Sequence, residues 1–214
     1  MNKKVVLNSL HSSSLKYIRD YEPDLIVSLD SHLDIQFMVE ETWKVIKERA
    51  PQDLREVMLR AYVHFMMSRN AKAYLVIPKT CFEFHALHDF AKARQLFDLD
   101  ITRKTVRSIV GNYRNLLRKM RDLGLMDLSL YLSPPKNIKK LADKVKGKNT
   151  IVDVDVDYMG EFQGECYTTL PDPKEEPEKG RFYPELKFGS EGDVIRLIKL
   201  IDPPLITISE YLPE

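Results

Sequence analysis

The hydrophobic and polar positions of the chain follow two different spacings along its length. Short apolar runs at residues 24–34, which end in polar residues, and at 72–78 predict strands. Residues 100–124 instead place apolar side chains three and four positions apart and end at Gly124, which predicts an amphipathic helix. Further predicted strands lie at 3–9, 125–135, 149–157 and 203–214, further helices at 11–23, 39–50, 51–71, 136–147 and 193–201, and a partly helical segment at 79–98.

Strands alternate with helices from one end of the chain to the other. This order predicts βα units, and hence an α/β fold of three layers, αβα, with a mainly parallel sheet. The stretch 168–192 is rich in proline, glycine and charge, which predicts a long surface loop rather than a linker. The length of 214 residues suits one domain over 1–214. In such sheets, ligands bind beyond the carboxyl ends of the strands.

Composition narrows the classes of protein that fit. No apolar run reaches the roughly 18 to 20 residues that a membrane span needs, so no membrane partner is expected. The first residues lack the features of a signal peptide, which predicts a cytoplasmic protein. Cys81 and Cys166 are isolated thiols, which indicates neither a disulfide framework nor a zinc knuckle.

Charge is unevenly distributed along the chain. Residues 102–150 carry 13 Lys and Arg against three Asp, so this segment has a charge of +10 while the whole chain has only +1. The remainder is therefore acidic. An anionic partner such as nucleic acid is one interpretation, and a lysine-rich solvated helix surface is the commoner alternative.

Distinctive polar residues follow four of the predicted strands. They are His11, then Asp30, His32 and Asp34, then Asp153, Asp155 and Asp157, and finally Glu210. In a strand the carboxylates of 153–157 would share one face and repel each other, and a bound cation would offset that repulsion. Carboxylates with a minority of imidazoles and no thiols favour Mn²⁺ over a structural Zn²⁺. Each motif alone is a weak signal, since a single Asp usually caps a turn or helix.

Together the four motifs resemble those of the ureohydrolases, such as arginase and agmatinase, whose fold is shared with the zinc-dependent deacetylases. "VVLNSLHS" resembles a strand that ends in Gly-Gly-Asp-His-Ser, with His11 on the His. "DSHLDIQ" resembles Asp-Ala-His-x-Asp, with Gln36 in place of a later Asn. "TIVDVDVD" resembles Ser-x-Asp-x-Asp, with Asp153 beside the ligands at the Ser position, and "SEYLP" places Glu210 on the Glu of Glu-x-Asn-Pro.

The resemblance implies a dinuclear manganese-dependent hydrolase that acts on a C–N bond of a guanidino or amidino substrate, with Zn²⁺ and Co²⁺ as alternative metals. It implies one ion bound by His11, Asp30, Asp34 and Asp155, and a second bound by Asp30, His32, Asp155 and Asp157, with Asp30 and Asp155 as bridges. The ions would activate water for attack on the substrate carbon. Asp157 and Glu210 are the implied catalytic residues, and Glu210 and Gln36 the implied contacts to a small cationic substrate.

The sequence departs from the family at several points. The Gly-Gly-Asp is replaced at residues 8–10, and the Asp-Pro that follows the second Asp motif is absent at 160–161. The family's His-Gly loop, which supplies a proton-shuttling histidine, has no clean match. His85 and His88 are candidate substitutes, and the alternative is that both are surface or packing histidines of a helix.

Two further hypotheses remain open. The first is a non-catalytic protein on this fold that uses the basic 102–150 region to bind nucleic acid or an acidic protein partner. The second is a mononuclear, deacetylase-like enzyme, against which His11 and Asp157 argue because a site for one metal would not need both. A homo-oligomer and a monomer both fit the sequence.

Overall fold

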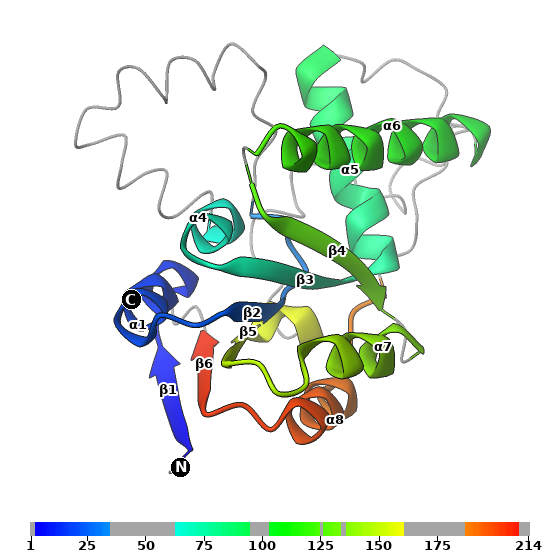
Figure 1. Ribbon diagram of the computed structural model, residues 1–214. Coiled ribbons are helices and arrows are strands. Elements are labelled where there is room, and N and C mark those ends of the chain that lie inside the picture. Colours follow the sequence, from blue (N-terminus) through cyan, green and yellow to red (C-terminus); the bar gives the residue numbers. More distant parts are fainter. Residues whose placement is uncertain are drawn as a thin grey trace.

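The protein contains one six-stranded sheet with helices on both of its faces (Figure 1). The computed structural model describes residues 3–34, 63–94, 103–124, 126–133, 136–160 and 187–209. In spatial order the strands are β1 (Lys4–Asn8), β6 (Leu205–Ser209), β5 (Thr150–Asp155), β2 (Leu25–Leu29), β3 (Lys72–Pro78) and β4 (Leu128–Ser133). All five strand pairings are parallel, which confirms the predicted α/β class and three-layer arrangement.

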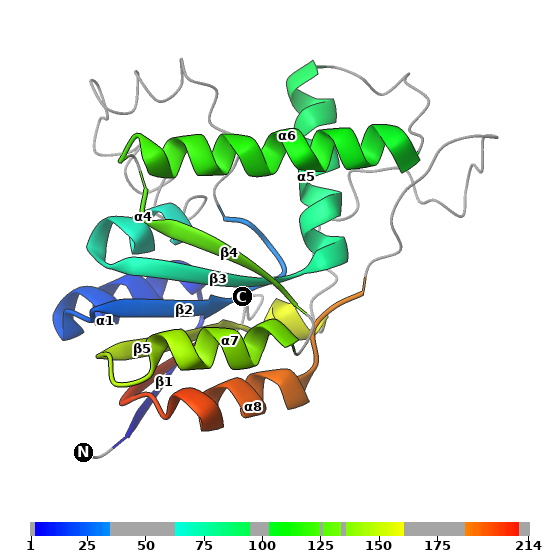
Figure 2. The same ribbon diagram turned by 45° about the vertical axis from the view of Figure 1, so that its right-hand side comes forward.

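The described helices divide between the two faces of the sheet (Figure 2). One face packs against α1 (Ser14–Tyr21), α4 (Val63–Asn70), α5 (Lys79–Arg94) and α6 (Arg103–Asp122), and the other against α7 (Lys136–Val145) and α8 (Glu191–Ile201). The helix predicted at 39–50 lies outside the described residues. Among the helices that the structure describes, none combines the length and the apolar character required to cross a membrane.

Strand β2 lies inside the sheet, and its sequence is almost continuously apolar because both of its faces are covered. Successive side chains of a strand point to opposite faces. Ile26 packs in the core beside α1 and α4, whereas Val27 and Leu29 pack beside α7 and α8. Because both faces are covered, all five residues of β2 are buried, including the polar Ser28.

The strand order brings together residues that are far apart in the chain. Strand β5 lies between β6 and β2, with Val154 opposite Leu29 and Asp155 opposite Ser209. The carboxyl ends of β2 and β5 are therefore neighbours. The 3₁₀ helix η1 (His11–Ser13) follows β1 and turns the chain toward the same edge.

The prediction of a strand through residue 157 was wrong. Strand β5 ends at Asp155, and the 3₁₀ helix η2 (Val156–Met159) follows it. The Asp155 carboxylate accepts a hydrogen bond of 3.2 Å from the backbone N–H of Asp157, which favours a turn over continued sheet pairing. Gly160 then ends η2 in the left-handed conformation, with φ of 78°. Asp157 therefore does not belong to the strand that carries Asp153 and Asp155.

The predicted surface loop at 168–192 lies mostly outside the described residues. Its last two positions, Glu191 and Gly192, instead form the first turn of α8. Ser190 caps this helix, because its hydroxyl accepts a hydrogen bond of 3.2 Å from the backbone N–H of Asp193. The helix therefore begins two residues before the predicted start at 193, because Ser190 is a helix cap rather than a loop residue.

Candidate metal centre

His11 lies at the middle of a group of carboxylates. Its Nε2 donates a hydrogen bond of 2.7 Å to Asp153 Oδ2. Its other nitrogen, Nδ1, faces three carboxylate oxygens, at 3.0 Å from Asp34, 3.2 Å from Asp155 and 3.3 Å from Asp30. Burial alone lowers the pKa of His11, yet these carboxylates, Asp153 above all, hold that pKa well above its usual value.

Asp153 is fully buried and held by its neighbours on both sides. Thr207 on β6 donates a hydrogen bond of 2.6 Å to Oδ1, and Ser28 on β2 donates one of 2.9 Å to Oδ2. Burial raises the pKa of Asp153, but the His11 imidazole and the Thr207 hydrogen bond bring it below the usual value. Asp153 is therefore a fixed anion that keeps a proton on His11 Nε2, so that Nδ1, which faces the other carboxylates, is the nitrogen that would release its proton to a metal, as the partner of a metal-binding histidine arranges.

We expect Asp153→Asn to weaken divalent-cation binding roughly 10- to 100-fold, the usual effect of losing the partner of a metal-binding histidine. Without the Asp153 charge, the pKa of His11 in metal-free protein should fall toward its usual value. Calorimetric titration with Mn²⁺ measures the first effect and an NMR titration of the histidines the second. Asp127→Asn, at an exposed position, is the control. An unchanged His11 titration would contradict the assigned role.

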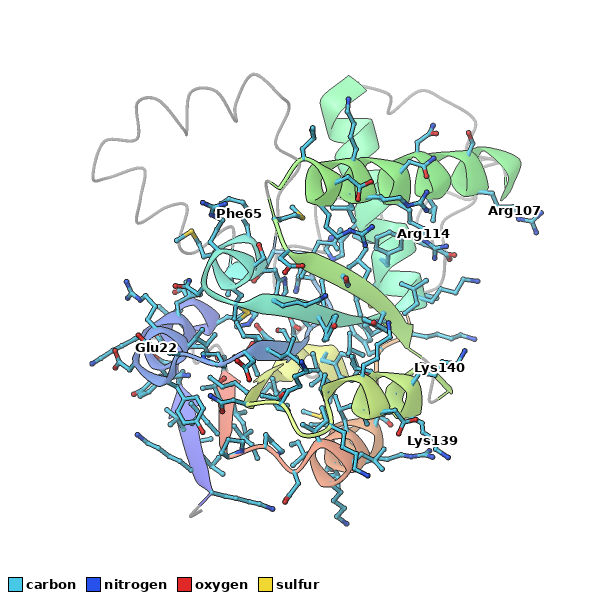
Figure 3. All side chains as sticks on the ribbon, viewed as in Figure 1. Glu22, Phe65, Arg107, Arg114, Lys139 and Lys140 are labelled. Carbon is cyan, nitrogen blue, oxygen red and sulfur yellow. The ribbon has the colours of Figure 1, made fainter. Side chains whose placement is uncertain are left out.

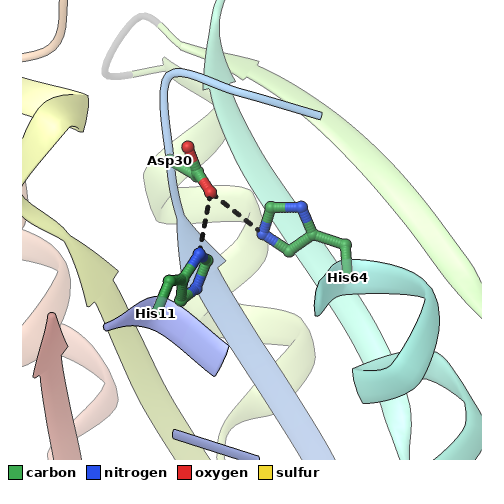
Figure 4. A group of neighbouring side chains, drawn as sticks. All are labelled: His11, Asp30 and His64. Atoms are coloured by element: carbon green, nitrogen blue, oxygen red, sulfur yellow. Dashed lines mark ion pairs between the residues drawn. The ribbon is translucent and has the colours of Figure 1, made fainter. Parts of the chain in front are cut away.

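His64, on α4, is part of the same group although the sequence did not single it out. Its ring is fully buried, and Nδ1 donates a hydrogen bond of 2.6 Å to the Leu33 carbonyl. Nε2 lies 3.1 Å from Ser28 Oγ and 3.4 Å from Asp30 Oδ2 (Figure 4). Because Nδ1 donates its proton to the Leu33 carbonyl, a neutral His64 carries its lone pair on Nε2, the nitrogen that faces Asp30 and Ser28.

The signal for His64 was weak but present in the sequence. The residue begins "HFMM" in a segment that was interpreted only as a helix. An imidazole within an apolar stretch is buried with that stretch, and a buried polar group needs a partner. Which partner it meets depends on how α4 packs, and the periodicity of one segment does not contain that information.

His32 and Asp157 form a second group on the other side of Asp30. His32 Nδ1 pairs with Asp157 Oδ2 and lies 3.5 Å from Asp30 Oδ1. Asp157 Oδ1 accepts a hydrogen bond of 3.1 Å from the backbone N–H of Ser31. Burial raises the pKa of Asp157, but the His32 imidazole and the Ser31 N–H lower it to about 2.

Asp30 joins the two groups of potential ligands. Within each group, His11, Asp30 and His64 in one and Asp30, His32 and Asp157 in the other, the ligand atoms lie within 4.8 Å of one another. Oδ1 of Asp30 accepts a hydrogen bond of 2.6 Å from the His32 N–H, while the buried Oδ2 accepts none from the residues that the structure describes. Leaving a buried carboxylate oxygen without a hydrogen bond is costly. A divalent cation between Asp30 Oδ2 and the two imidazoles would remove that cost, so the residues fit the implied metal.

Asp34 and Asp155 lie at the more exposed side of His11. Their side chains are 24% and 19% exposed. Burial and repulsion from Asp30 raise the pKa of Asp155 to about 8. Both carboxylates face His11 Nδ1, but neither belongs to the two groups of ligand atoms described above. Asp30 is shared by the two groups, and the bridging roles of Asp30 and Asp155 stay predictions.

Of the remaining predicted site residues, the structure describes the side chain of His85 only. His85, on α5, lies beside the second group, with Nε2 3.1 Å from the Ser31 carbonyl and its ring centre 5.1 Å from that of His32. The side chain of His88 lies outside the described part of the chain, as do Gln36 and Glu210. The predicted contacts to a substrate therefore stay predictions.

Cys81 is not a nucleophile at this site. It is buried at the start of α5, and burial raises the pKa of its thiol to about 12. A thiolate is the reactive form of cysteine, and this pKa keeps the thiol protonated near neutral pH. A reaction at this group of carboxylates would therefore use water, rather than Cys81, as the nucleophile.

Comparison with known proteins leaves the family open. No family model matches the chain, and no curated protein matches it either. The ureohydrolase resemblance therefore stays a prediction that rests on the motifs themselves.

Proposed function

We propose that the protein is a metal-dependent hydrolase whose centre holds two divalent cations on either side of Asp30. The observation that carries this proposal is the buried Asp30 Oδ2, which accepts no hydrogen bond from the described part of the chain and lies 3.3 Å from His11 Nδ1 and 3.4 Å from His64 Nε2. Carboxylate and imidazole ligands without thiolate favour Mn²⁺, with Zn²⁺ and Co²⁺ as alternatives.

The residues divide into ligands and residues that orient them. His11 and His64 would hold one cation, His32 and Asp157 the other, and Asp30 both. A bound divalent cation lowers the pKa of coordinated water toward neutrality, which supplies a nucleophile for hydrolysis. Asp153 and the Leu33 carbonyl fix the protons of His11 and His64 on the nitrogens that face away from Asp30. Asp34 Oδ2 and Asp155 Oδ2 would accept protons at the exposed side.

The charge of the centre suits a cationic substrate. Its carboxylates are Asp30, Asp34, Asp153, Asp155 and Asp157. Five ionised carboxylates exceed the four positive charges of two divalent cations, so the loaded site stays negative and attracts cations. Together with the motif resemblance, this supports hydrolysis of a C–N bond in a guanidino or amidino compound.

The test is product release by protein reconstituted with Mn²⁺. We expect urea or ammonia from a panel of guanidino and amidino compounds that includes arginine and agmatine, and loss of this activity in Asp30→Asn. Asp20→Asn, at an exposed position on α1, should keep it. Acetate release from an acetyl-lysine peptide alone would replace the proposal with a deacetylase. Failure to bind any of Mn²⁺, Zn²⁺ or Co²⁺ would reject a metal-dependent enzyme.

A further inference from the structure

A basic groove lies at the edge of the sheet formed by β4. Within the described residues, β4 is the last strand of the sheet and pairs only with β3. A cavity of about 540 Å³ follows this edge between α6 and α7. We call it the basic groove; it is lined by Arg114, Leu117, Arg118 and Arg121 of α6, residues 128–132 of β4, and Lys144 of α7.

The arginines of the groove belong to a longer row on α6. Arg107, Arg114, Arg118 and Arg121 follow one another at spacings of seven, four and three residues, which places them on one side of the helix. All four are exposed, and at 1.5 Å per residue the row is about 21 Å long. Asp122, which lies 3.3 Å from Arg121, is the only acidic residue of α6.

A second set of cations lies on the other side of β4. Lys139, Lys140 and Lys144 are exposed residues of α7. Figure 3 places Arg107 and Arg114 on α6 and Lys139 and Lys140 on α7, with β4 running between the two helices. Lys144 is the α7 residue that lines the groove, and the exposed Asp143 is the one acidic residue of α7. The groove therefore has an excess of positive charge on both sides, which is the electrostatic pattern of a surface that follows a polyanion.

The floor of the groove offers a fixed aromatic ring. Tyr131 is partly exposed, and its ring stands at 87° to that of Tyr74, with 5.3 Å between the ring centres. Its hydroxyl accepts a hydrogen bond of 2.8 Å from Lys144 Nζ. These two contacts hold the ring on the α7 side of the β4 edge. Leucines 128, 130 and 132 point to the α6 side, so the ring and the arginines line the groove from opposite sides of this edge.

We propose that the basic groove binds a single strand of nucleic acid, with phosphates on the arginine row and a base against Tyr131. Positive grooves with aromatic platforms bind single strands in this way, because every base has a stackable face. A duplex keeps its bases stacked inside and would leave Tyr131 uncovered. An acidic peptide would match the charge but would make no use of the ring. This site is separate from the residues of the metal centre and does not depend on the proposed hydrolysis.

The test is the binding of fluorescein-labelled dT12 and rU12, followed by anisotropy from about 50 to 200 mM salt. We expect Arg118→Glu/Arg121→Glu to weaken binding at least tenfold and to reduce the slope of log K against log salt by about 1.4, or 0.7 for each lost phosphate contact. Lys16→Glu/Arg19→Glu on α1 makes the same change in net charge at exposed positions away from the groove, and should keep the affinity within about twofold of wild type. Arg118→Gln/Arg121→Gln, which adds no negative charge, should reproduce the loss if the Glu variant does not fold.

Substitutions of Tyr131 test the contact between its ring and a base. Tyr131→Ala should weaken dT12 binding roughly five- to hundredfold, whereas Tyr131→Phe, which keeps the ring, should stay close to wild type. Three results would overturn the proposal: no salt-dependent binding of either oligonucleotide, equal losses in the α1 control, or a matched duplex that binds as tightly and is insensitive to Tyr131→Ala. Displacement of dT12 by an equally charged poly-glutamate peptide at equal concentration would assign the groove to an acidic protein instead.

Discussion

Asp30→Ala is expected to remove both cations from the protein, whereas loss of one histidine removes only one. Asp30 is shared by the two groups of ligand atoms, and its two oxygens face different groups. His64→Ala takes a ligand only from the His11 group, so we expect about one Mn²⁺ per chain in that variant, none in Asp30→Ala, and two in wild type. The loss of affinity in Asp30→Ala should exceed the roughly 10- to 100-fold effect of removing an outer partner.

Metal content after dialysis, measured by mass spectrometry, gives these ratios directly. Because Asp30→Ala leaves a space in a buried site, Asp30→Asn serves as a second variant that keeps the shape and removes the charge. Asp20→Ala, on the exposed side of α1, controls for the loss of a carboxylate elsewhere. Two bound ions in Asp30→Ala, or none in wild type, would be incompatible with a centre built around this residue.

Mn²⁺ should stabilise the protein more at about pH 8 than at about pH 5. The folded pKa of Asp155 is about 8, above its usual value near 3.9, so the stability that its proton provides is complete below about pH 3.9 and is lost as the pH rises through 8. The folded pKa of His11 is also raised, so the stability that its proton provides is likewise lost as the pH rises above about 6.5. Asp157 acts in the opposite direction, but its stabilising effect is lost only as the pH falls from about 3.9 toward 2, below this window.

Metal-free protein should therefore lose stability between about pH 5 and 8, and a bound cation should restore it by replacing the lost protons. At a free Mn²⁺ concentration 100 times Kd, binding contributes about 2.7 kcal/mol, which corresponds to a rise in Tm of roughly 5 to 10 °C for a chain of this size. Thermal unfolding with and without a chelator at both pH values measures the effect. Asp155→Asn should melt higher than wild type at pH 8 when both lack metal, since it removes one of the repelling charges. A chelated protein that melts at pH 8 as high as the Mn²⁺ form would disprove this account.

The sequence predicts the fold better than the site. Helices and strands follow from patterns within each segment, whereas the candidate site depends on contacts between residues far apart in the chain. Each strand and helix carries its own periodicity, so residues 100–124 were assigned as helical without knowledge of the rest. The end of β5 was missed because a single side-chain contact, from Asp155 to the Asp157 N–H, overrides the strand pattern there. Contacts of this kind are decided by individual atoms rather than by a repeating pattern.

The sequence indicates candidate ligands that follow strands, but it does not indicate the candidate ligand His64, which lies on a packed helix. Asp30, His32 and Asp157 come together near the carboxyl ends of β2 and β5 because the strand order makes these ends neighbours. His64 reaches the group from α4, and only the packing of that helix on the sheet brings its Nε2 to 3.4 Å from Asp30. No local motif records that packing.

The position of β5 between β2 and β6 also determines when the centre can form during folding. His11, Asp30 and His64 are all translated long before residues 150–155, yet Asp153, which orients His11, arrives only with β5. Pairings between strands this distant in sequence form slowly. The chain loses the entropy of closing a long loop before the contacts between the strands can stabilise it. A nascent chain that lacks β5 would hold three of the ligands without the anion that arranges them. The arrangement of side chains that the proposed metal centre requires therefore forms only in the completed sheet.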